Sequence, residues 1–360
     1  MKKKLLFTAY SLGLGGIETA LCNLLNHLDY SKYEVTLILE KKEGIFLDQI
    51  PTEVKVLEYK ISDNKIVLFR KIYNRLKLIK WRRKLHNKYD FSCSYATYSR
   101  PGAYLALAAS TNNAIWIHSN YYNVCNQDEK QMIKELTSVY AHKFKKVVFV
   151  SEDSKETTCK YFKELKDKSI VIGNIVDGES MIEKSNEKID LKKNNDITFI
   201  NVSRHEEFTK KISRIINASK TLKTEGYKFR VILVGDGENH KDYVKQVKDN
   251  NLEDTIIFTG MKKNPFPYYK IADAAVLSSD IEGYPVVFLE AMVLGKTILS
   301  TKVSDYKNLD GKYGLFCEKT EEAVYNMMKD YLNNGFKLKE TFDYEDYNKK
   351  IVFKIEKELI

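Results

Sequence analysis

Glu282 and Glu290 lie in the segment EGYPVVFLEAM, one before and one inside an apolar run. Carboxylates among apolar residues are costly unless a partner compensates their burial, so both need an explanation. Pro285 and Gly295 predict a helix over 285–294, whose free N–H groups and positive dipole end favour a phosphate. Two hydroxyl-binding carboxylates beside a phosphate site describe a nucleotide sugar. A solvent-exposed helix face with an incidental glutamate is an equal alternative from this window alone.

Cationic residues follow a predicted strand in the segment NVSRHEEFTKK, where Arg204 comes first and Lys210 and Lys211 enter the next helix. A guanidinium and an ammonium group at this spacing can both reach a diphosphate and neutralise the charge that develops on it as a leaving group. Two further turns have weaker signals. The turn at 235–237 lets a ligand approach the backbone closely, and the turn around Met261 could hold the edge of a nucleotide base through backbone groups. Both turns also fit ordinary strand–helix loops.

A glycine-rich loop, SLGLGGIE at 11–18, follows the first predicted strand. Such a loop lets backbone N–H groups approach phosphate or sugar oxygens at a helix N-terminus. The dinucleotide fingerprint G-x-G-x-x-G fails here, because counting from Gly13 its last position is Glu18. A carboxylate there would repel a pyrophosphate, and a capping glutamate is a common structural feature.

Short β-branched runs alternate with helical patterns along the chain and must position these residues. Strands are predicted at 4–10, 34–40, 91–97, 113–118 and 146–151, and again at 197–203, 229–235, 255–259, 275–278 and 297–301. Helices are predicted between them, for example at 17–28 and 212–222. This alternation predicts an α/β fold of two doubly wound domains that face each other across a cleft, with ligands at the carboxyl ends of the strands. The predicted domains are 1–173 and 174–340, and 341–360 is expected to be a helix that docks back on the first domain.

The composition of the whole chain limits the classes of protein. The length of 360 residues fits two domains, and no run is long and apolar enough for a transmembrane helix. The basic start reads as a strand rather than a signal peptide, because its apolar run is short and has no cleavage site. Five scattered cysteines favour reduced thiols and a cytoplasmic protein. The formal net charge of +10 fits nucleic acid, an anionic membrane or phosphorylated substrates.

Together the motifs resemble the retaining GT-B glycosyltransferases of family 4, and the resemblance covers most of the chain. The matching motifs are the Gly-Gly-x-Glu loop (Gly15, Gly16, Glu18), the strand-end His118, the Arg-x5-Lys pair (Arg204, Lys210), the Gly-Asp-Gly turn (235–237) and the Glu-x7-Glu signature (Glu282, Glu290). The last is the most specific. Its aromatic-Pro version is similar to bacterial enzymes that build capsules, O-antigens or teichoic-type polymers.

The resemblance implies a donor-binding second domain, an acceptor-binding first domain, and a role for each matched residue. Glu282 would contact the donor sugar, Glu290 the ribose, Arg204 and Lys210 the diphosphate, His118 the sugar near the reacting centre, and Gly15 and Gly16 the phosphates or acceptor. The donor site would also include Gly235, Asp236, Met261, Gly283, Tyr284, Val286 and Val287. Lys211 and Ser203 stand where the family usually has glycine, so either Lys210 or Lys211 could reach the diphosphate.

The chemistry that the resemblance implies is transfer with retention, from a UDP-linked donor, by front-face displacement. No carboxylate is an evident covalent nucleophile. No D-x-D pair stands at a strand end, so we expect no metal and no cofactor besides the donor substrate. His118 also fits a purely structural role, because a histidine at a strand end is usually a hydrogen-bonded structural residue.

The segment 65–88 is basic and has apolar residues at helical spacing: Phe69, Ile72, Tyr73, Leu76 and Ile79. A basic amphipathic helix is typical of proteins that bind membrane surfaces. A helix that packs these residues into the core and exposes a basic face is an equal alternative. Since a polymer-assembly acceptor would be a lipid-linked saccharide, we expect a cytoplasmic protein that docks transiently on the inner leaflet.

Three other functions compete with sugar transfer to a saccharide or lipid-linked saccharide. A sugar-nucleotide epimerase or hydrolase of the same fold would need no acceptor. An NAD-dependent oxidoreductase is disfavoured by Glu18. A nucleic-acid-binding protein would explain the charge, but it leaves Glu282 and Glu290 unexplained, because carboxylates oppose phosphate backbones.

Overall fold

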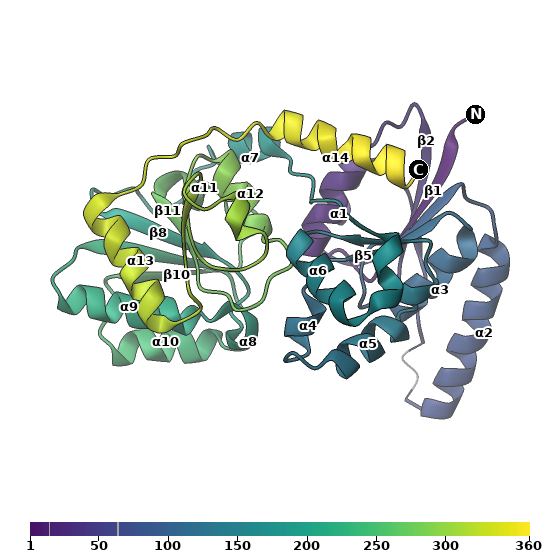
Figure 1. Ribbon diagram of the computed structural model, residues 1–360, viewed down its shortest axis with the longest axis horizontal. Helices are drawn as coiled ribbons and strands as arrows, with labels where there is room; N and C mark the ends of the chain where they lie inside the picture. Colours follow the sequence, from purple (N-terminus) through teal and green to yellow (C-terminus); the bar gives the residue numbers. More distant parts are fainter. Residues whose placement is uncertain (14, 63–64) are drawn as a thin grey trace. The chain divides into compact units, whose positions relative to one another are not determined.

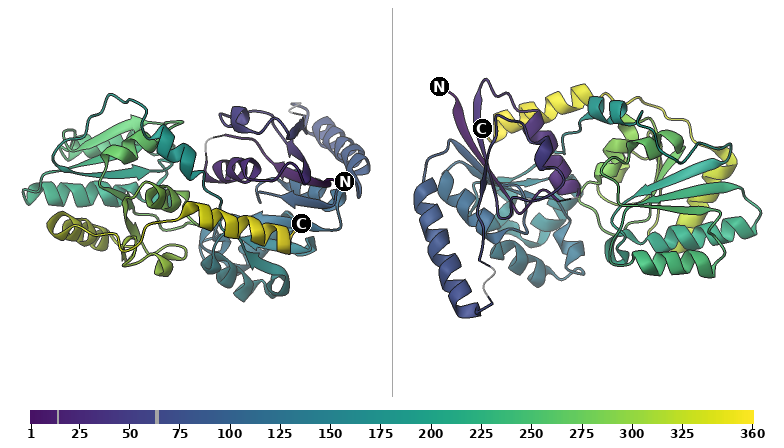
Figure 2. Two further views of the ribbon diagram at one scale, coloured as in Figure 1. Left: turned by 90° about the horizontal axis from the view of Figure 1, so that it is seen from above. Right: turned by 180° about the vertical axis from the view of Figure 1, so that it is seen from behind.

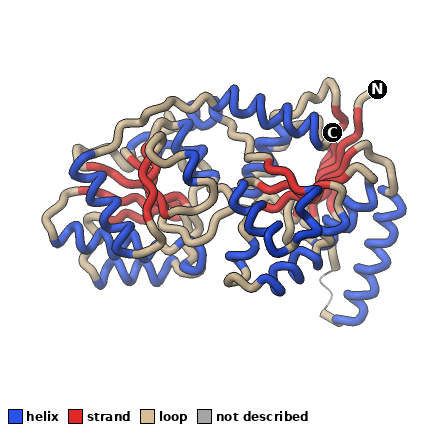
Figure 3. Tube along the Cα trace, in the orientation of Figure 1, coloured by secondary structure: helices blue, strands red, loops and turns tan. Residues whose placement is uncertain are grey.

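The computed structural model describes residues 1–13, 15–62 and 65–360, so Leu14 of the predicted glycine loop lies outside the described residues. The chain divides into unit 1, which comprises Met1–Ile175 and Asp346–Ile360, and unit 2, Val176–Glu345. Each unit is built on one parallel sheet with helices on both faces (Figures 1 and 3). The predicted fold class, two Rossmann-like doubly wound α/β domains, is therefore confirmed.

Unit 1 contains a seven-stranded sheet in the order β3-β2-β1-β4-β5-β6-β7. Its strands are β1 Lys3–Ala9, β2 Tyr33–Leu39, β3 Lys55–Glu58, β4 Phe91–Ser94, β5 Asn113–Ile117, β6 Lys146–Phe149 and β7 Ser169–Val171. Its helices are α1 Gly16–Asn26, α2 Val67–Leu85, α3 Arg100–Ala109, α4 Tyr121–Val124, α5 Glu129–Ser138 and α6 Glu152–Tyr161, with 3₁₀ turns at Leu47–Gln49, Ala141–Lys143 and Lys163–Lys168.

Unit 2 contains a six-stranded sheet in the order β10-β9-β8-β11-β12-β13. Its strands are β8 Ile197–Val202, β9 Phe229–Val234, β10 Ile256–Gly260, β11 Ala274–Leu277, β12 Thr297–Thr301 and β13 Gly314–Cys317. Its helices are α7 Gly178–Lys184, α8 Glu207–Lys210, α9 Ile212–Thr224, α10 His240–Asp249, α11 Phe266–Ile271, α12 Val286–Val293 and α13 Glu321–Asn334, with a 3₁₀ turn at Tyr306–Asn308.

The strand order reverses once in each sheet, and this reversal positions the candidate residues. In unit 2, β9 and β10 extend the sheet on one side of β8, whereas β11, β12 and β13 extend it on the other side. The connections that leave β8 and β11 therefore run in opposite directions. Ligands of doubly wound folds bind beside the carboxyl ends of the strands at this point. The loops that carry Arg204 and Glu282 follow β8 and β11 respectively.

The sequence located most strands but missed β3, β7 and β13. β3 and β7 form the two edges of the first sheet and β13 forms one edge of the second. Edge strands are short and half-exposed, so they lack the continuous apolar runs of buried parallel strands. The predicted strand 91–97 is longer than β4 because Tyr95 and Ala96 stay buried after the ladder ends.

The last helix, α14 Tyr344–Glu358, packs its C-terminal part within unit 1. Asn112 Nδ2 donates to the carbonyl of Leu359 over 2.6 Å, and Tyr33 donates to Glu356 over 2.9 Å. Lys3 Nζ donates to the carbonyl of Ile360 over 2.9 Å, so both ends of the chain lie in this unit (Figure 2).

The basic segment forms helix α2, which packs on the core through side chains other than the five apolar residues named from the sequence. Leu78, Trp81 and Leu85 contact the hydrophobic core beside α3. The apolar residues that were candidates for core packing are exposed instead: Phe69, Ile72, Tyr73, Leu76 and Ile79. The helix is therefore packed on the core, as the alternative interpretation expects, but not through these five residues. Among the described residues, no helix has both the length and the apolar character needed to span a bilayer.

Candidate active site

Glu282 and Lys210 meet at the carboxyl edge of the unit 2 sheet. The ammonium group of Lys210 lies 2.5 Å from Glu282 Oε1, and their side chains are 24% and 10% exposed. Ser279 donates a second hydrogen bond to the same carboxylate oxygen over 2.7 Å. The carboxylate that follows β11 is therefore paired with the cation that follows β8, at the strand reversal. This pairing explains how Glu282 is accommodated in a largely buried position.

The local backbone distinguishes Lys210 from Lys211. Lys211 adopts the left-handed conformation (φ 50°) between α8 and α9, a conformation that glycine adopts without strain. The carbonyls of both lysines accept from Ser278, over 3.1 and 2.7 Å, which ties the junction to the end of β11. The Lys211 side chain lies 4.0 Å from Glu207, whereas Lys210 reaches Glu282. This geometry favours Lys210 as the lysine of the site.

Helix α12 offers unsatisfied N–H groups next to Glu282. It begins at Val286, so the prediction that Pro285 occupies its first turn is wrong: Pro285 is the N-cap residue, with ψ 119°. The extended ψ angle takes Pro285 out of the helix, and no side chain caps the N-terminus. The first-turn N–H groups of Val286 and Val287 have no partner within the helix. They form an anion-attracting helix end beside the Lys210–Glu282 pair.

The loop before α12 is fixed by packing. Gly283 is buried, and its carbonyl accepts from Ser304 over 2.5 Å. The ring of Tyr284 packs edge-on against Phe288, with centroids 6.2 Å apart. The first turn of α12 is therefore held in place before any ligand binds.

Glu290 lies in the interior of unit 2. It is 8% exposed and accepts a hydrogen bond from Tyr269 of α11 over 2.8 Å. The alternative of a solvent-exposed helix face is therefore wrong. Burial raises the pKa of Glu290 to about 7, although the Tyr269 hydrogen bond opposes the shift. Glu282 and Glu290 thus have different partners, a lysine and a tyrosine.

Glu290→Gln is expected to stabilise the protein at alkaline pH. A carboxyl whose pKa is raised from 4.5 to about 7 by folding makes stability fall as pH rises between these values. Removing this charge should raise the free energy of unfolding at pH 8 by up to ~3 kcal/mol and change little at pH 4. Denaturant unfolding at both pH values measures this, with the exposed Glu253→Gln as control. A gain of the same size at both pH values would contradict the expectation.

Arg204 and the turn at 235–237 form the neighbouring part of the same edge. Arg204 is exposed, and its guanidinium forms no ion pair within the part of the chain that the structure describes. His205 N donates to the carbonyl of the exposed Asp236 over 3.0 Å, and Gly235 N donates to Gly260 over 3.0 Å. The loops after β8, β9 and β10 are therefore joined, and they hold Arg204 at the rim.

Gly235 cannot carry a side chain. Its φ is 147°, and a Cβ atom there would lie 1.9 Å from the carbonyl oxygen of Ser203. We expect Gly235→Ala to lower the free energy of unfolding by roughly 2–4 kcal/mol, as thermal or denaturant unfolding would measure. Gly226→Ala is the matched control, because Gly226 also has a positive φ but its Cβ would meet open space. Equal losses in both variants would show that strain alone, without the clash, explains the effect.

His118 lies at the end of β5 in unit 1 and is 9% exposed. Its Nε2 lies 2.9 Å from the carbonyl oxygen of Tyr95. Because a carbonyl only accepts, Nε2 carries the proton and Nδ1 remains an acceptor. Burial lowers the pKa of His118 to about 4, so the ring is neutral at physiological pH. It can therefore accept a hydroxyl proton in a hydrogen bond but does not act as a cationic acid there.

The glycine loop of unit 1 presents a carboxylate. Gly15 is the N-cap of α1, and Gly16 is the first residue of this helix. Glu18 lies so close to Gly15 that a Cβ on the glycine would meet its Oε2 at 2.4 Å. The other oxygen of Glu18 accepts from Tyr98 over 2.6 Å. A carboxylate at this helix end disfavours a phosphate at the loop and suits a hydroxyl-bearing ligand.

The structure thus brings some predicted residues together and adds partners that the sequence did not indicate. Lys210 joins Glu282, and Gly235 and Asp236 join the loop of Arg204. Met261 directly follows β10 and is 56% exposed at the same rim. The unpredicted partners are Ser279, Tyr269 and Tyr95. Among the described residues, no group of three or more His, Cys, Asp or Glu side chains could hold a metal ion.

Two family models match the chain in tandem. The model described as "Glycosyltransferase Family 4" matches residues 14–180, and the model described as "Glycosyl transferases group 1" matches residues 182–349. The two ranges adjoin and together take in nearly the whole chain. They fall on unit 1 and unit 2 respectively, apart from a few residues near the boundaries.

Individual relatives and solved structures are similar to the chain along different lengths. The N-acetylgalactosamine-N,N'-diacetylbacillosaminyl-diphospho-undecaprenol 4-alpha-N-acetylgalactosaminyltransferase of Campylobacter jejuni is 26% identical over 92% of this chain and 91% of its own. An uncharacterized glycosyltransferase of Methanocaldococcus jannaschii is 26% identical over 54% of this chain, and the match spans about half (49%) of that protein. The crystal structure of Anabaena HepE with UDP and glucose has a TM-score of 0.76 at 19% identity, covering 98% and 99% of the two chains, which shows a shared fold.

Proposed function

We propose that this chain, which belongs to the glycosyltransferases of group 1 and family 4 and has the GT-B fold, transfers a sugar from a UDP-sugar to a lipid-linked saccharide. The observation that carries the proposal is the Lys210–Glu282 pair beside the uncapped N-terminus of α12. The Lys210 ammonium and the free N–H groups of the helix can bind a diphosphate. The Glu282 carboxylate can accept hydrogen bonds from sugar hydroxyls.

The donor diphosphate would lie between the Lys210 ammonium, the Arg204 guanidinium and the first turn of α12. Without a donor, Lys210 is neutralised by Glu282. A bound diphosphate would also pair with this lysine and so weaken the lysine's hold on Glu282. The carboxylate oxygens of Glu282 could then accept hydrogen bonds from the hydroxyls of the transferred hexose or N-acetylhexosamine. UDP is proposed as the nucleotide because HepE, which shares the fold, was solved with UDP and with UDP-glucose.

We propose transfer with retention, by front-face displacement and without a metal. The bond from sugar C1 to the phosphate oxygen breaks, and the acceptor oxygen bonds to C1 on the same face. The proton of the acceptor hydroxyl passes to the departing phosphate oxygen. Lys210 and Arg204 would neutralise the charge on that phosphate. The neutral Nδ1 of His118 would accept a hydrogen bond from the sugar.

We propose cell-surface polysaccharide synthesis at the inner face of the membrane, with α2 as the docking helix. Four of its apolar side chains are more than half exposed: Leu68 (66%), Phe69 (62%), Tyr73 (54%) and Leu76 (63%). The segment 65–88 contains ten Lys or Arg residues and no Asp or Glu. An apolar face among basic residues is complementary to an anionic lipid surface. The C. jejuni relative is named for an acceptor on diphospho-undecaprenol.

Substituting the apolar face of α2 tests the docking. Phe69→Ser with Leu76→Ser is expected to weaken co-sedimentation with vesicles of phosphatidylcholine and phosphatidylglycerol about tenfold or more, because two inserted apolar side chains are lost. Phe353→Ser on α14 is the matched control, since Phe353 is 64% exposed on another helix. Equal binding by the wild type and the double variant would refute docking through α2.

A transfer assay tests the proposed reaction. The full-length protein, with a chelator present, is incubated with a panel of labelled UDP-sugars and a bacterial lipid-linked saccharide extract. The expected product is a labelled lipid-linked saccharide whose new linkage has the anomeric configuration of the donor. Release of free sugar whether or not the extract is present would support a hydrolase instead, and conversion of the UDP-sugar without release would support an epimerase.

A further inference from the structure

A groove between α2 and α3 in unit 1 has no role in the proposed donor site. Its volume is about 1170 Å³, and it is lined from α2 by Arg75, Arg82 and Arg83, and from α3 by Arg100 and Tyr104. Tyr140 also lines it, and none of the lining residues within the described part of the chain is acidic. The groove is therefore a candidate site for an anion.

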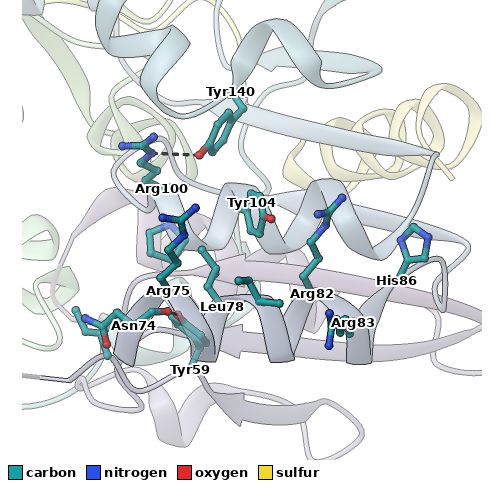
Figure 4. A pocket seen from close by; sticks show the side chains of 13 residues that line it. Tyr59, Asn74, Arg75, Leu78, Arg82, Arg83, His86, Arg100, Tyr104 and Tyr140 are labelled. Carbon is teal, nitrogen blue, oxygen red and sulfur yellow. Dashed lines mark hydrogen bonds between the residues drawn. The ribbon is translucent and has the colours of Figure 1, made fainter. Parts of the chain in front are cut away.

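The arginines of the groove are positioned but not neutralised. Arg75 and Arg82 lie two helical turns apart on α2 and project on the same side, where they flank Tyr104 (Figure 4). Arg82 stacks over the Tyr104 ring at 5.6 Å, and Arg100 stacks over Tyr140 at 5.5 Å and donates to its hydroxyl. Within residues 1–13, 15–62 and 65–360, no carboxylate forms an ion pair with these arginines. Their aromatic neighbours orient the guanidinium groups and leave their charge available.

Four guanidinium groups around one groove, those of Arg75, Arg82, Arg83 and Arg100, match a phosphorylated ligand. The planar guanidinium donates paired hydrogen bonds to phosphate oxygens, which lysine cannot reproduce. Arg100 also begins α3, so the positive end of that helix dipole lies at the groove. A diphosphate carries enough oxygens to engage Arg75 and Arg82 together, which a single phosphate would do less well.

The groove adjoins the exposed apolar side chains of α2, such as Phe69, Ile72 and Leu76. This position favours a lipid as the ligand. Ile79 lines the groove and is also one of the exposed apolar residues of α2. A ligand whose diphosphate lies at the arginines can therefore place a hydrocarbon chain along the apolar face without crossing polar surface. A water-soluble phosphate would leave that face unused.

We propose that the α2–α3 groove binds the diphosphate of a lipid-linked acceptor. This inference rests on the proposed function and adds the place where the lipid end of the acceptor is held. The arginines would recognise the diphosphate that joins saccharide and lipid, while α2 contacts the bilayer. The groove would select acceptors on a diphosphate lipid over the same saccharide on a neutral lipid.

The test compares two variants with equal loss of charge. Arg75→Ala with Arg82→Ala removes two groove arginines, and Arg70→Ala with Lys80→Ala removes two cations of α2 outside the groove. Calorimetry measures inorganic pyrophosphate binding in saturating UDP, so that the donor site does not contribute. We expect at least about a tenfold loss of affinity in the groove variant and less than about twofold in the control. Equal losses in both variants would overturn the inference.

Vesicles identify the source of the diphosphate. Binding to phosphatidylcholine vesicles with a small fraction of farnesyl diphosphate should fall in the groove variant far more than in the control variant. Binding to vesicles with phosphatidylglycerol should fall equally in both. A groove variant that loses pyrophosphate but still binds the farnesyl diphosphate vesicles like the wild type would overturn the lipid assignment. UDP binding is measured on the same samples: its absence contradicts the proposed function, whereas normal UDP binding with equal pyrophosphate losses contradicts only the groove.

Discussion

Lys210→Ala is expected to lower the turnover number of sugar transfer by about 10²–10³-fold. Lys210 is the cation that the fold brings to Glu282, at the edge where the diphosphate would leave. Its charge would oppose the negative charge that grows on the departing phosphate, so its loss should affect turnover more than donor binding. Initial rates with saturating UDP-sugar and acceptor give the turnover number.

The neighbouring lysine provides the matched control for this prediction. Lys211→Ala removes the same charge one residue away, but Lys211 lies near Glu207 and not near Glu282. We expect its turnover to stay within about threefold of the wild type. If Lys211→Ala were the damaging variant and Lys210→Ala were active, the assignment of the diphosphate lysine would be reversed.

His118→Ala is expected to reduce turnover by about 10²-fold, and this is the second large effect. The substitution removes the Nδ1 acceptor that would contact the sugar, and it also leaves the Tyr95 carbonyl without its donor. Because burial lowers the pKa of His118 to about 4, the wild-type rate should show no titration of this group between pH 6 and 8.

Two readouts separate a role in the reaction from a structural role of His118. UDP binding, which the proposal places in unit 2, should be unchanged in His118→Ala. The folded fraction at the assay temperature, followed by circular dichroism, should also match the wild type. A folded variant with normal turnover would show that His118 is only structural, as its position at a strand end also permits.

Arg204, Lys210 and Glu282 could be predicted from the sequence because each lies in the connection that leaves the carboxyl end of a strand, β8 for Arg204 and Lys210 and β11 for Glu282. The carboxyl ends of parallel strands lie at one edge of the sheet, so the sequence predicts Arg204 and Glu282 at the same edge. Their contacts could not be predicted in the same way. Tyr269 binds Glu290 from another helix 21 residues away, and nothing in the pattern FPYYKI indicates it. Burial of Glu290 thus depends on tertiary packing.

Helix α2 shows the limit of periodicity most clearly. Phe69, Ile72 and Leu76 have the spacing of a core-facing stripe, yet they are exposed. A second apolar set that includes Leu78 and Leu85 packs against the core instead. One helix therefore carries two apolar faces, and the sequence alone does not say which one the domain covers. The groove with Arg75 and Arg82 could not be predicted either, because it forms only when α2 packs beside α3.

The central claim is that unit 2 binds a UDP-linked donor at the edge formed by Arg204, Lys210, Glu282 and α12. The most direct test is calorimetric titration of UDP, GDP, ADP and NAD, without metal, into the wild type and Arg204→Ala. Arg204 is exposed, so its substitution should leave the unfolding temperature unchanged. We expect selective UDP binding that weakens at least about tenfold in the variant. Absence of nucleotide binding, or equal UDP affinity in both proteins, would contradict it.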